Sequence, residues 1–168
     1  VRRREREGSG LMSRIQINGV TKQFGEVTAL DGIDLDIADG EFFCVLGPPG
    51  AGKTTLLRTI VGLERPEAGR VLIGDTDVTD LVPSARNVSI VFQNLALYPD
   101  KTVFDNLAFP LRQGKEKVSS SEIDRRVRET AEILQIVPLL KRRPAHLSGG
   151  ERQRVAIGRC LVRAPLVY

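Results

Sequence analysis

The sequence predicts an α/β fold, and three observations support this prediction. A glycine-rich loop at residues 47–54 stands between an apolar run and a helical pattern, as where a buried strand leads into a helix. Short runs of strand character dominate the first half of the chain, and capped helical patterns dominate the second. We therefore expect an α/β core with an N-terminal antiparallel β-subdomain and an inserted helical subdomain over about residues 95–147.

Strand patterns follow one another through the first half of the chain, at residues 14–20, 33–37, 42–46, 70–74 and 87–92. The first alternates apolar and polar residues and is typical of an edge strand. The second also alternates, and it ends at Asp39-Gly40, which is a hairpin signal. The run 42–46 is continuously apolar, so we expect a buried core strand there, and the run 87–92 is a second candidate core strand.

Helix signals begin after Gln93. Thr102 is a capping residue for a helix over about 103–113, and Ser119–Glu122 forms a capping box for a longer helix that extends to about Val137. A second capping box, Ser148–Glu151, opens the next helix. At the end of the chain, residues 165–168 have the character of a buried strand. We therefore expect the chain to be a fragment of a longer domain.

Composition places the chain among soluble globular proteins of one domain, with 168 residues, 41% of them hydrophobic, and a net charge of +4. Residues 1–12 form a charged segment that we expect to be a disordered tail, with the true start at Val1 or Met12. Most other basic residues are interspersed with acidic ones, so we expect no nucleic-acid partner. Cys44 and Cys160 are interpreted as reduced core thiols of a cytosolic protein.

The loop Gly47-Pro48-Pro49-Gly50-Ala51-Gly52-Lys53-Thr54 fits the phosphate-binding pattern G-x-x-x-x-G-K-[ST]. Its glycines allow successive backbone amides to point at a triphosphate, which also faces the positive N-terminus of the following helix. Lys53 supplies a charge to the β- and γ-phosphates, and the Thr54 hydroxyl is a natural magnesium ligand. The alternative is a glycine turn with no ligand. The Lys-Thr-Thr ending and both flanking patterns favour nucleotide binding.

A second anion site is predicted at Ser148-Gly149-Gly150, where a hydroxyl and exposed amides stand at a helix N-terminus. Taken alone, this run is equally typical of an ordinary helix cap. Together with the phosphate loop it becomes specific, because one loop leaves some γ-phosphate oxygens without a partner.

These motifs together resemble the nucleotide-binding subunit of an ABC transporter, which has a P-loop NTPase core, over about residues 13–168. Residues 47–55 resemble the Walker A motif, and residues 147–153 resemble the ABC signature. Gln93 resembles the Q-loop glutamine, which in the family reaches magnesium and the attacking water and senses the membrane subunits. Phe24 resembles the aromatic residue that stacks on adenine. Its alternative is a half-buried strand aromatic.

The resemblance implies ATP and Mg²⁺ as cofactors, with catalytic roles for Lys53 and Gln93 and metal contacts from Thr54 and Gln93. The nucleotide contacts that it implies are Phe24, Gly47, Gly50, Ala51, Gly52, Lys53, Thr54, Thr55, Ser148, Gly149 and Gly150. The sequence departs from the family pattern at two positions. Pro49 lacks the N–H of the usual small polar residue, and Glu151 replaces the commoner glutamine and is expected to turn back toward the Ser148 N–H.

The implied partners are a second ATP-binding subunit in a head-to-tail homodimer, transmembrane permease subunits and, indirectly, an extracytoplasmic solute-binding protein. Each ATP would lie between Lys53 of one subunit and Ser148 and Gly149 of the other, at the cytoplasmic face of the inner membrane. Residues 91–99 and 102–109 resemble the carbohydrate-importer subgroup. Polyamine and iron importers carry similar runs, so the solute stays open.

The family's Walker B aspartate, catalytic glutamate and switch histidine do not occur in these residues, so we expect weak nucleotide binding and no turnover from the 168-residue chain. Magnesium-dependent ATPase activity of this chain would contradict that expectation. Two alternatives remain for the intact protein: a soluble ABC-type ATPase of nucleic-acid repair or translation, and a degenerate subunit that only binds nucleotide. The sequence beyond Tyr168 would separate them.

Overall fold

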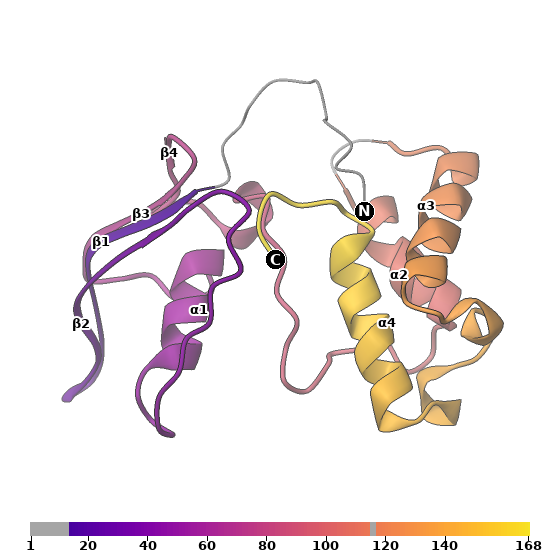
Figure 1. The fold of residues 1–168 in the computed structure, drawn as a ribbon, viewed down its shortest axis with the longest axis horizontal. Helices are drawn as coiled ribbons and strands as arrows, with labels where there is room; N and C mark the ends of the chain where they lie inside the picture. Colours follow the sequence, from indigo (N-terminus) through magenta and orange to yellow (C-terminus); the bar gives the residue numbers. More distant parts are fainter. Residues whose placement is uncertain (1–13, 115–116) are drawn as a thin grey trace. The chain divides into compact units, whose positions relative to one another are not determined.

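The computed structural model describes residues 14–114 and 117–168, which form two compact units that meet in sequence at Val88 and Ser89 (Figure 1). We call residues 14–88 the sheet unit and the described residues from 89 to 168 the helical unit. The predicted tail, residues 1–12, lies outside the described residues.

The sheet unit contains one antiparallel sheet and one helix, α1 (Lys53–Val61). The strands are β1 (Ile15–Phe24), β2 (Val27–Ile37), β3 (Ala68–Ile73) and β4 (Thr76–Asp77), in the order β2-β1-β3-β4. The prediction of an edge strand at residues 14–20 is wrong, because β1 pairs with β2 on one side and with β3 on the other. Its alternation has a different cause: Ile15, Ile17 and Val20 bury one face of an interior strand.

The predicted strand at residues 42–46 does not form. Phe42 is 95% exposed and Leu46 is 87% exposed, and Cys44 is exposed as well, contrary to the expected core thiol. The chain does turn at Asp39-Gly40, where the Glu41 amide donates to the Ala38 carbonyl at 3.2 Å. However, a strand needs backbone partners on a neighbouring strand. Within the described residues, no strand pairs with the run after this turn, so no hairpin results.

The expected core strands at residues 87–92 and 165–168 are also absent as regular elements. One hydrogen bond connects the two segments, from the Ser89 amide to the Val167 carbonyl at 2.9 Å. Cys160, the second predicted core thiol, is half-buried, and burial raises the pKa of its thiol.

The helical unit contains α2 (Val103–Arg112), α3 (Ser120–Ile133) and α4 (Gly149–Leu161), together with the short 3-10 turns η2 (Val137–Leu139) and η3 (Pro144–His146); a third turn, η1 (Pro83–Ala85), lies in the sheet unit. The N-caps predicted at Thr102 and Ser119 form, because Thr102 accepts from the Asp105 amide and Ser119 from the Glu122 amide. The capping box expected at Ser119 is incomplete, because the Glu122 carboxylate accepts from Arg125 and Arg126 instead. α3 ends earlier than predicted. Gln135 adopts a left-handed conformation (φ 55°) close to its end, and the next residue, Ile136, is fully buried.

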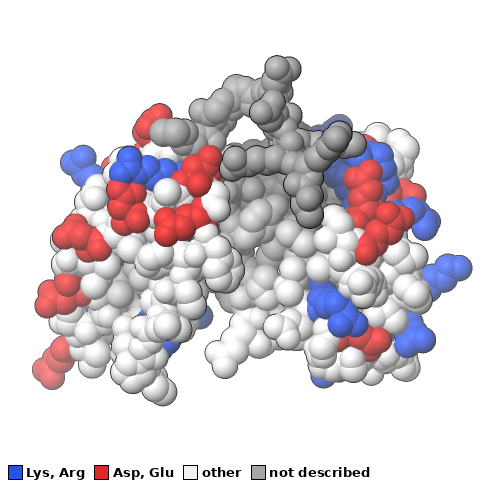
Figure 2. All heavy atoms as spheres, in the orientation of Figure 1, with Lys and Arg blue, Asp and Glu red and all other residues white. Residues whose placement is uncertain are grey.

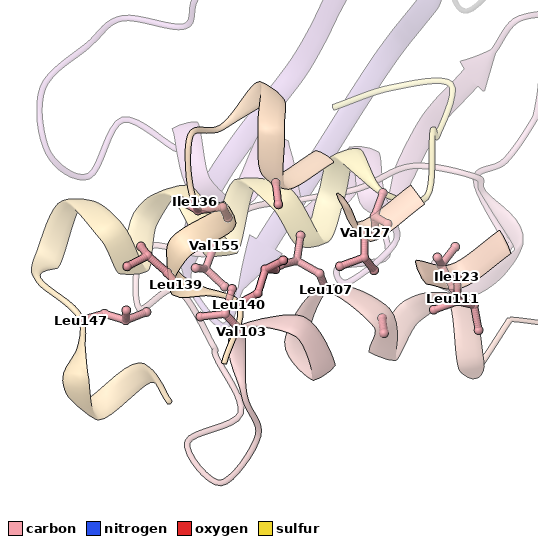
Figure 3. Close-up of a cluster of buried hydrophobic side chains, with 13 residues drawn as sticks. Val103, Leu107, Leu111, Ile123, Val127, Ile136, Leu139, Leu140, Leu147 and Val155 are labelled. Carbon is pink, nitrogen blue, oxygen red and sulfur yellow. The ribbon is translucent and has the colours of Figure 1, made fainter. Parts of the chain in front are cut away.

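One apolar cluster holds the helical unit together (Figure 3). It contains side chains from all three helices and from the segments between α3 and α4, among them Val103, Leu107, Leu111, Ile123, Val127, Ile136, Leu139, Leu140, Leu147 and Val155. α4 approaches α2 closely at Gly158, where an added Cβ would lie 2.7 Å from the Leu107 side chain. No helix among residues 14–114 and 117–168 combines the length and the apolar character needed to cross a bilayer.

Candidate functional site

The phosphate loop contains a tight turn that its two prolines and glycine explain. The Ala51 amide donates to the Pro48 carbonyl at 3.3 Å, and Gly50 has a φ of 84°. Proline fixes φ near −65° at Pro49, so residues 48–51 form a type II turn with proline and glycine at its two central positions. Pro49 therefore provides no donor to a phosphate, but it holds the loop in its turned conformation.

Gly52 joins the loop to α1 and to the sheet. Its φ is 78°, and a Cβ at this position would lie 2.3 Å from the Ala29 carbonyl oxygen on β2. The Leu56 amide donates to the Gly52 carbonyl at 2.8 Å, which begins the helix. The amides of Lys53, Thr54 and Thr55 lie in the first turn, where a helix offers no internal acceptor. They are therefore available to an anion at the positive end of α1.

Lys53 folds over the loop, with its Nζ donating to the carbonyls of Gly47 at 2.8 Å and Pro48 at 2.6 Å. No acidic residue lies in the first turn of α1, so nothing there repels an anion. Thr54 is exposed, which leaves its hydroxyl open to a ligand. A cation, free first-turn amides and a hydroxyl next to a glycine-lined turn fit a polyphosphate with its magnesium ion.

Phe24 ends β1 opposite Val27, and its side chain is 47% exposed. Two residues further along β2, the Ala29 carbonyl oxygen lies 2.3 Å from where a Cβ of Gly52 would be, so the phosphate loop approaches the strand that pairs with the Phe24 end of β1. The Lys22 ammonium lies 5.2 Å from the centre of the Phe24 ring and also donates to the Arg65 carbonyl and to Glu67. The ring is thus held by a cation–π contact, and about half of its side-chain surface stays open to a flat ligand.

The second predicted anion site forms the start of α4. Ser148 Oγ accepts from the Glu151 amide at 3.3 Å, and a Glu151 carboxylate oxygen accepts from the Ser148 amide at 2.7 Å. This reciprocal capping box confirms the expected orientation of Glu151. The Ser148 N–H holds the pKa of Glu151 below its usual range. At Gly149 and Gly150 a Cβ would meet nothing within 4 Å, so their backbone is open to approach.

Gln93 is exposed, in a turn at the start of a segment that contains two left-handed residues, Leu95 (φ 60°) and Ala96 (φ 44°). The predicted site residues thus fall into two groups. Phe24 and residues 47–55 belong to the sheet unit, whereas Gln93 and residues 148–150 belong to the helical unit.

Two buried polar side chains, Asn106 and Arg86, stabilise the segments that carry these two groups of residues. Neither was predicted from the sequence. The Asn106 side chain is fully buried, accepts from the Tyr98 amide at 2.9 Å and donates to the carbonyls of Tyr98, Lys101 and Thr102. Arg86 is 3% exposed and donates to carbonyls at the end of α1, those of Thr59 and Ile60. The signal for Asn106 was available, since an amide stands alone among the apolar positions of α2.

A sheet, a glycine loop at the start of α1 and a lysine over that loop define a phosphate-binding-loop protein of the α/β class. The family profile described as ABC transporter matches residues 30–168. The chain therefore belongs to the ABC transporter family.

Curated relatives support the same assignment. The chain is 51% identical over 163 residues to the trehalose/maltose import ATP-binding protein of Thermococcus litoralis, covering 94% of this chain and 43% of that protein. It is 52% identical over 161 residues to the sn-glycerol-3-phosphate import ATP-binding protein of Yersinia pseudotuberculosis, with coverage of 94% and 44%. An α-glucoside transport ATP-binding protein of Rhizobium meliloti is 50% identical. The chain spans less than half the length of these relatives.

Solved structures show the same fold. A dimeric bacterial ABC transporter cassette superposes with a TM-score of 0.80 at 34% identity, covering 90% of this chain and 70% of that one. The dimeric post-hydrolysis state of such a cassette, bound to ADP and phosphate, also gives a TM-score of 0.80, at 33% identity, with the same coverage.

Proposed function

We propose that this chain is the nucleotide-binding part of the ATP-binding, ATP-hydrolysing subunit of an ABC importer. The observation that carries this proposal is the phosphate loop, in which a type II turn, the Gly52 approach to β2 and the Lys53 ammonium surround the start of α1. The names of the curated relatives, all ATP-binding proteins of import or transport, support the importer assignment.

In this proposal, Lys53 leaves the Gly47 and Pro48 carbonyls and pairs with the β- and γ-phosphates, while the amides of the loop residues other than the two prolines donate to phosphate oxygens. Phe24 offers its open face to adenine. Thr54 and Gln93 would hold Mg²⁺, which supplies charge neutralisation during phosphoryl transfer. Gln93 would also orient the attacking water.

The second anion site suggests a second copy of the subunit as partner. Ser148, Gly149 and Gly150 would contact the γ-phosphate held by the loop of the other copy, in a head-to-tail homodimer with two equivalent sites. The dimeric state of the cassettes that this chain resembles supports this arrangement. We further propose that residues 13–168 act as one ATP-binding domain with a helical subdomain over about 95–147, docked on permease subunits at the cytoplasmic face of the inner membrane.

The solute is proposed only by class, as a sugar or another small polar solute, because the relatives are named for trehalose and maltose, for sn-glycerol 3-phosphate and for α-glucoside. A solute-binding protein outside the membrane would act indirectly. A soluble ABC-type ATPase of repair or translation is the alternative, and the importer names of the relatives favour the first proposal.

A mixing experiment tests the head-to-tail site in the protein that carries this chain at its natural length. Lys53→Met removes the phosphate-binding cation, and Ser148→Arg blocks the second anion site. Each variant alone forms pairs in which both sites are damaged, whereas a mixed pair retains one complete site. We expect ATP-dependent association, measured by size-exclusion chromatography, to be absent for each variant alone and to return on mixing. Association of either variant alone, or none in the mixture, would contradict the arrangement.

A further inference from the structure

The segment between Gln93 and Tyr98, which we call the hinge segment, has an unfavourable backbone conformation. Leu95 and Ala96 both have positive φ, 60° and 44°, and neither is glycine. A Cβ makes the left-handed region unfavourable, so consecutive residues stay there only when their surroundings hold them. The Leu95 amide donates to the Phe92 carbonyl at 2.9 Å and the Ala96 amide to the Asn94 carbonyl at 2.7 Å, which closes two tight turns, the first of which contains Gln93.

Arg159, on the last turn of α4, holds this segment in two ways. Its Nη1 donates to the Ala96 carbonyl, and its guanidinium carbon lies 4.8 Å from the centre of the Tyr98 ring. Tyr98 in turn is fixed to α2, because its amide and carbonyl both bind the buried Asn106 side chain. The far end of the hinge segment is therefore anchored to α2, and its strained middle is anchored to α4.

The two ends of α4 have different contacts. Ser148 caps its start, and Arg159 lies eleven residues later, about 16 Å along a helix that rises about 1.5 Å per residue. The packing of Gly158 against Leu107 and the burial of Val155 keep this helix in the core of the helical unit. One packed helix therefore connects the Ser148 cap to the residue that holds the hinge segment.

We propose that Arg159 is a positioning residue that holds the strained hinge segment, and thereby Gln93, in a conformation set by the helix that starts at Ser148. Nucleotide contact at Ser148 and the position of Gln93 are then coupled through α4 within one helical unit. This inference rests on the proposed γ-phosphate contact of Ser148 and the proposed metal and water contacts of Gln93, but the contacts of Arg159 exist independently of them.

Hydrogen exchange on the full 168-residue chain tests the contact without requiring any nucleotide. In Arg159→Met, which keeps the length of the side chain but loses its donors, we expect the Leu95 and Ala96 amides to exchange about tenfold faster, the effect of losing one hydrogen bond from a charged group. The Val155 amide, in the core of α4, should not change. Arg159→Lys should restore part of the protection. Unchanged exchange at residues 95 and 96, or an equal increase at Val155, would overturn the proposal.

A second variant tests the strain. Ala96→Gly removes the Cβ that opposes the left-handed conformation. If Arg159 holds a strained segment, Arg159→Met should accelerate exchange at Leu95 less in the Ala96→Gly background than in the native one. Equal effects in the two backgrounds would overturn the strain that the proposal requires.

A kinetic test applies to the protein at its natural length. Arg159→Met should lower the kcat of ATP hydrolysis several-fold with little change in KM, because the phosphate loop lies in the other unit. A change confined to KM would overturn the role in positioning Gln93. A native protein without ATPase activity would contradict the proposed function, while the exchange experiment would still report on Arg159.

Discussion

The sheet unit and the helical unit differ in how far their apolar residues are covered. In the helical unit, side chains from α2, α3, α4 and the segments between α3 and α4 close into one cluster. In the sheet unit, β1 and β3 bury apolar residues such as Ile17 and Val71, yet Phe42 and Leu46 remain almost fully exposed. Helices satisfy their backbone internally and need only one covered face, whereas a strand also needs neighbouring strands. Local sequence signals therefore specify the helices of the helical unit more completely than they specify the strands of the sheet unit.

The ion pairs of the two units also differ in how far apart their members lie in the sequence. Acidic and basic side chains adjoin one another on the visible face of the helical unit (Figure 2). α3 contributes Arg125 between Glu122 and Glu129, and Arg128 beside Asp124. In the sheet unit, the pairs Lys22–Glu67 and Arg14–Asp36 connect different strands or loops. The helix thus stabilises itself locally, and the sheet depends on distant residues.

The largest effect should come from Gly52, where the sheet unit binds the phosphate loop. Gly52→Ala places a Cβ against the Ala29 carbonyl in a left-handed conformation, and we expect a loss of about 3 kcal/mol in the free energy of unfolding. Gly50→Ala is the matched control: its φ is also positive, but its Cβ meets nothing within 4 Å, so about 1 kcal/mol is expected. Urea unfolding followed by circular dichroism would measure both. Equal losses would remove the argument for close packing.

In the helical unit, the substitution expected to destabilise the fold most is at Asn106. Asn106→Leu leaves the Tyr98 amide without its acceptor and removes a side-chain donor from the carbonyls of Tyr98, Lys101 and Thr102, and we expect a loss of about 2 kcal/mol in the free energy of unfolding. The exposed Gln113, at the C-terminus of α2, provides the control, since Gln113→Ala should change stability by less than about 0.5 kcal/mol. Thermal denaturation measures the difference, and a neutral Asn106→Leu would show that the segment does not need this anchor.

A substitution at Pro49 tests the phosphate loop of the sheet unit through nucleotide binding instead of stability. Pro49→Ala restores a backbone donor but frees the turn, so the two effects have opposite signs. If the preset turn dominates, Mg-ATP should bind about 2- to 5-fold more weakly, the fold-change that corresponds to the usual gain from a compatible proline. Isothermal titration calorimetry would show it. Tighter binding by Pro49→Ala would mean that the missing N–H matters more than the turn.

The smallest effect concerns the stability that the ion pairs of α3 contribute, and its loss at acid pH. Hydrogen bonds from Arg125 and Arg126 lower the pKa of Glu122 to about 2 from its usual 4.5. A carboxyl group with a lowered pKa in the folded state stabilises the protein at pH above 4.5, and this stabilisation is lost as the pH falls toward 2. We expect native protein to exceed Glu122→Gln slightly in urea midpoint at pH 7, with the difference vanishing near pH 2. A difference that persists at pH 2 would exclude these ion pairs as its cause.

The sequence predicted the helical unit well because its signals are local. Thr102, Ser119 and Ser148 each cap the helix that was expected, and Glu151 turns back as its capping box requires. The end of α3 was misplaced because the left-handed turn at Gln135 serves tertiary burial of the next residue, Ile136. Residues 42–46 were misassigned for a related reason, since apolar character indicates burial but cannot supply the strand that would pair with them.

The site was predictable where motif spacing encodes backbone geometry, as at Gly50 and Gly52. The roles of Arg86 and Arg159 were not, because each acts through carbonyl groups of residues that the fold brings to it. The type II turn at Pro49 was within reach of sequence analysis, since proline followed by glycine favours that turn.

The central claim is that the phosphate loop of the sheet unit binds nucleotide through Lys53, and calorimetric titration of Mg-ATP into the 168-residue chain tests it directly. We expect saturable binding by the native chain, its loss in Lys53→Met, and its retention in Arg58→Met, which removes another cation from α1 outside the loop. No saturable binding by the native chain, or equal binding by Lys53→Met, would contradict the account.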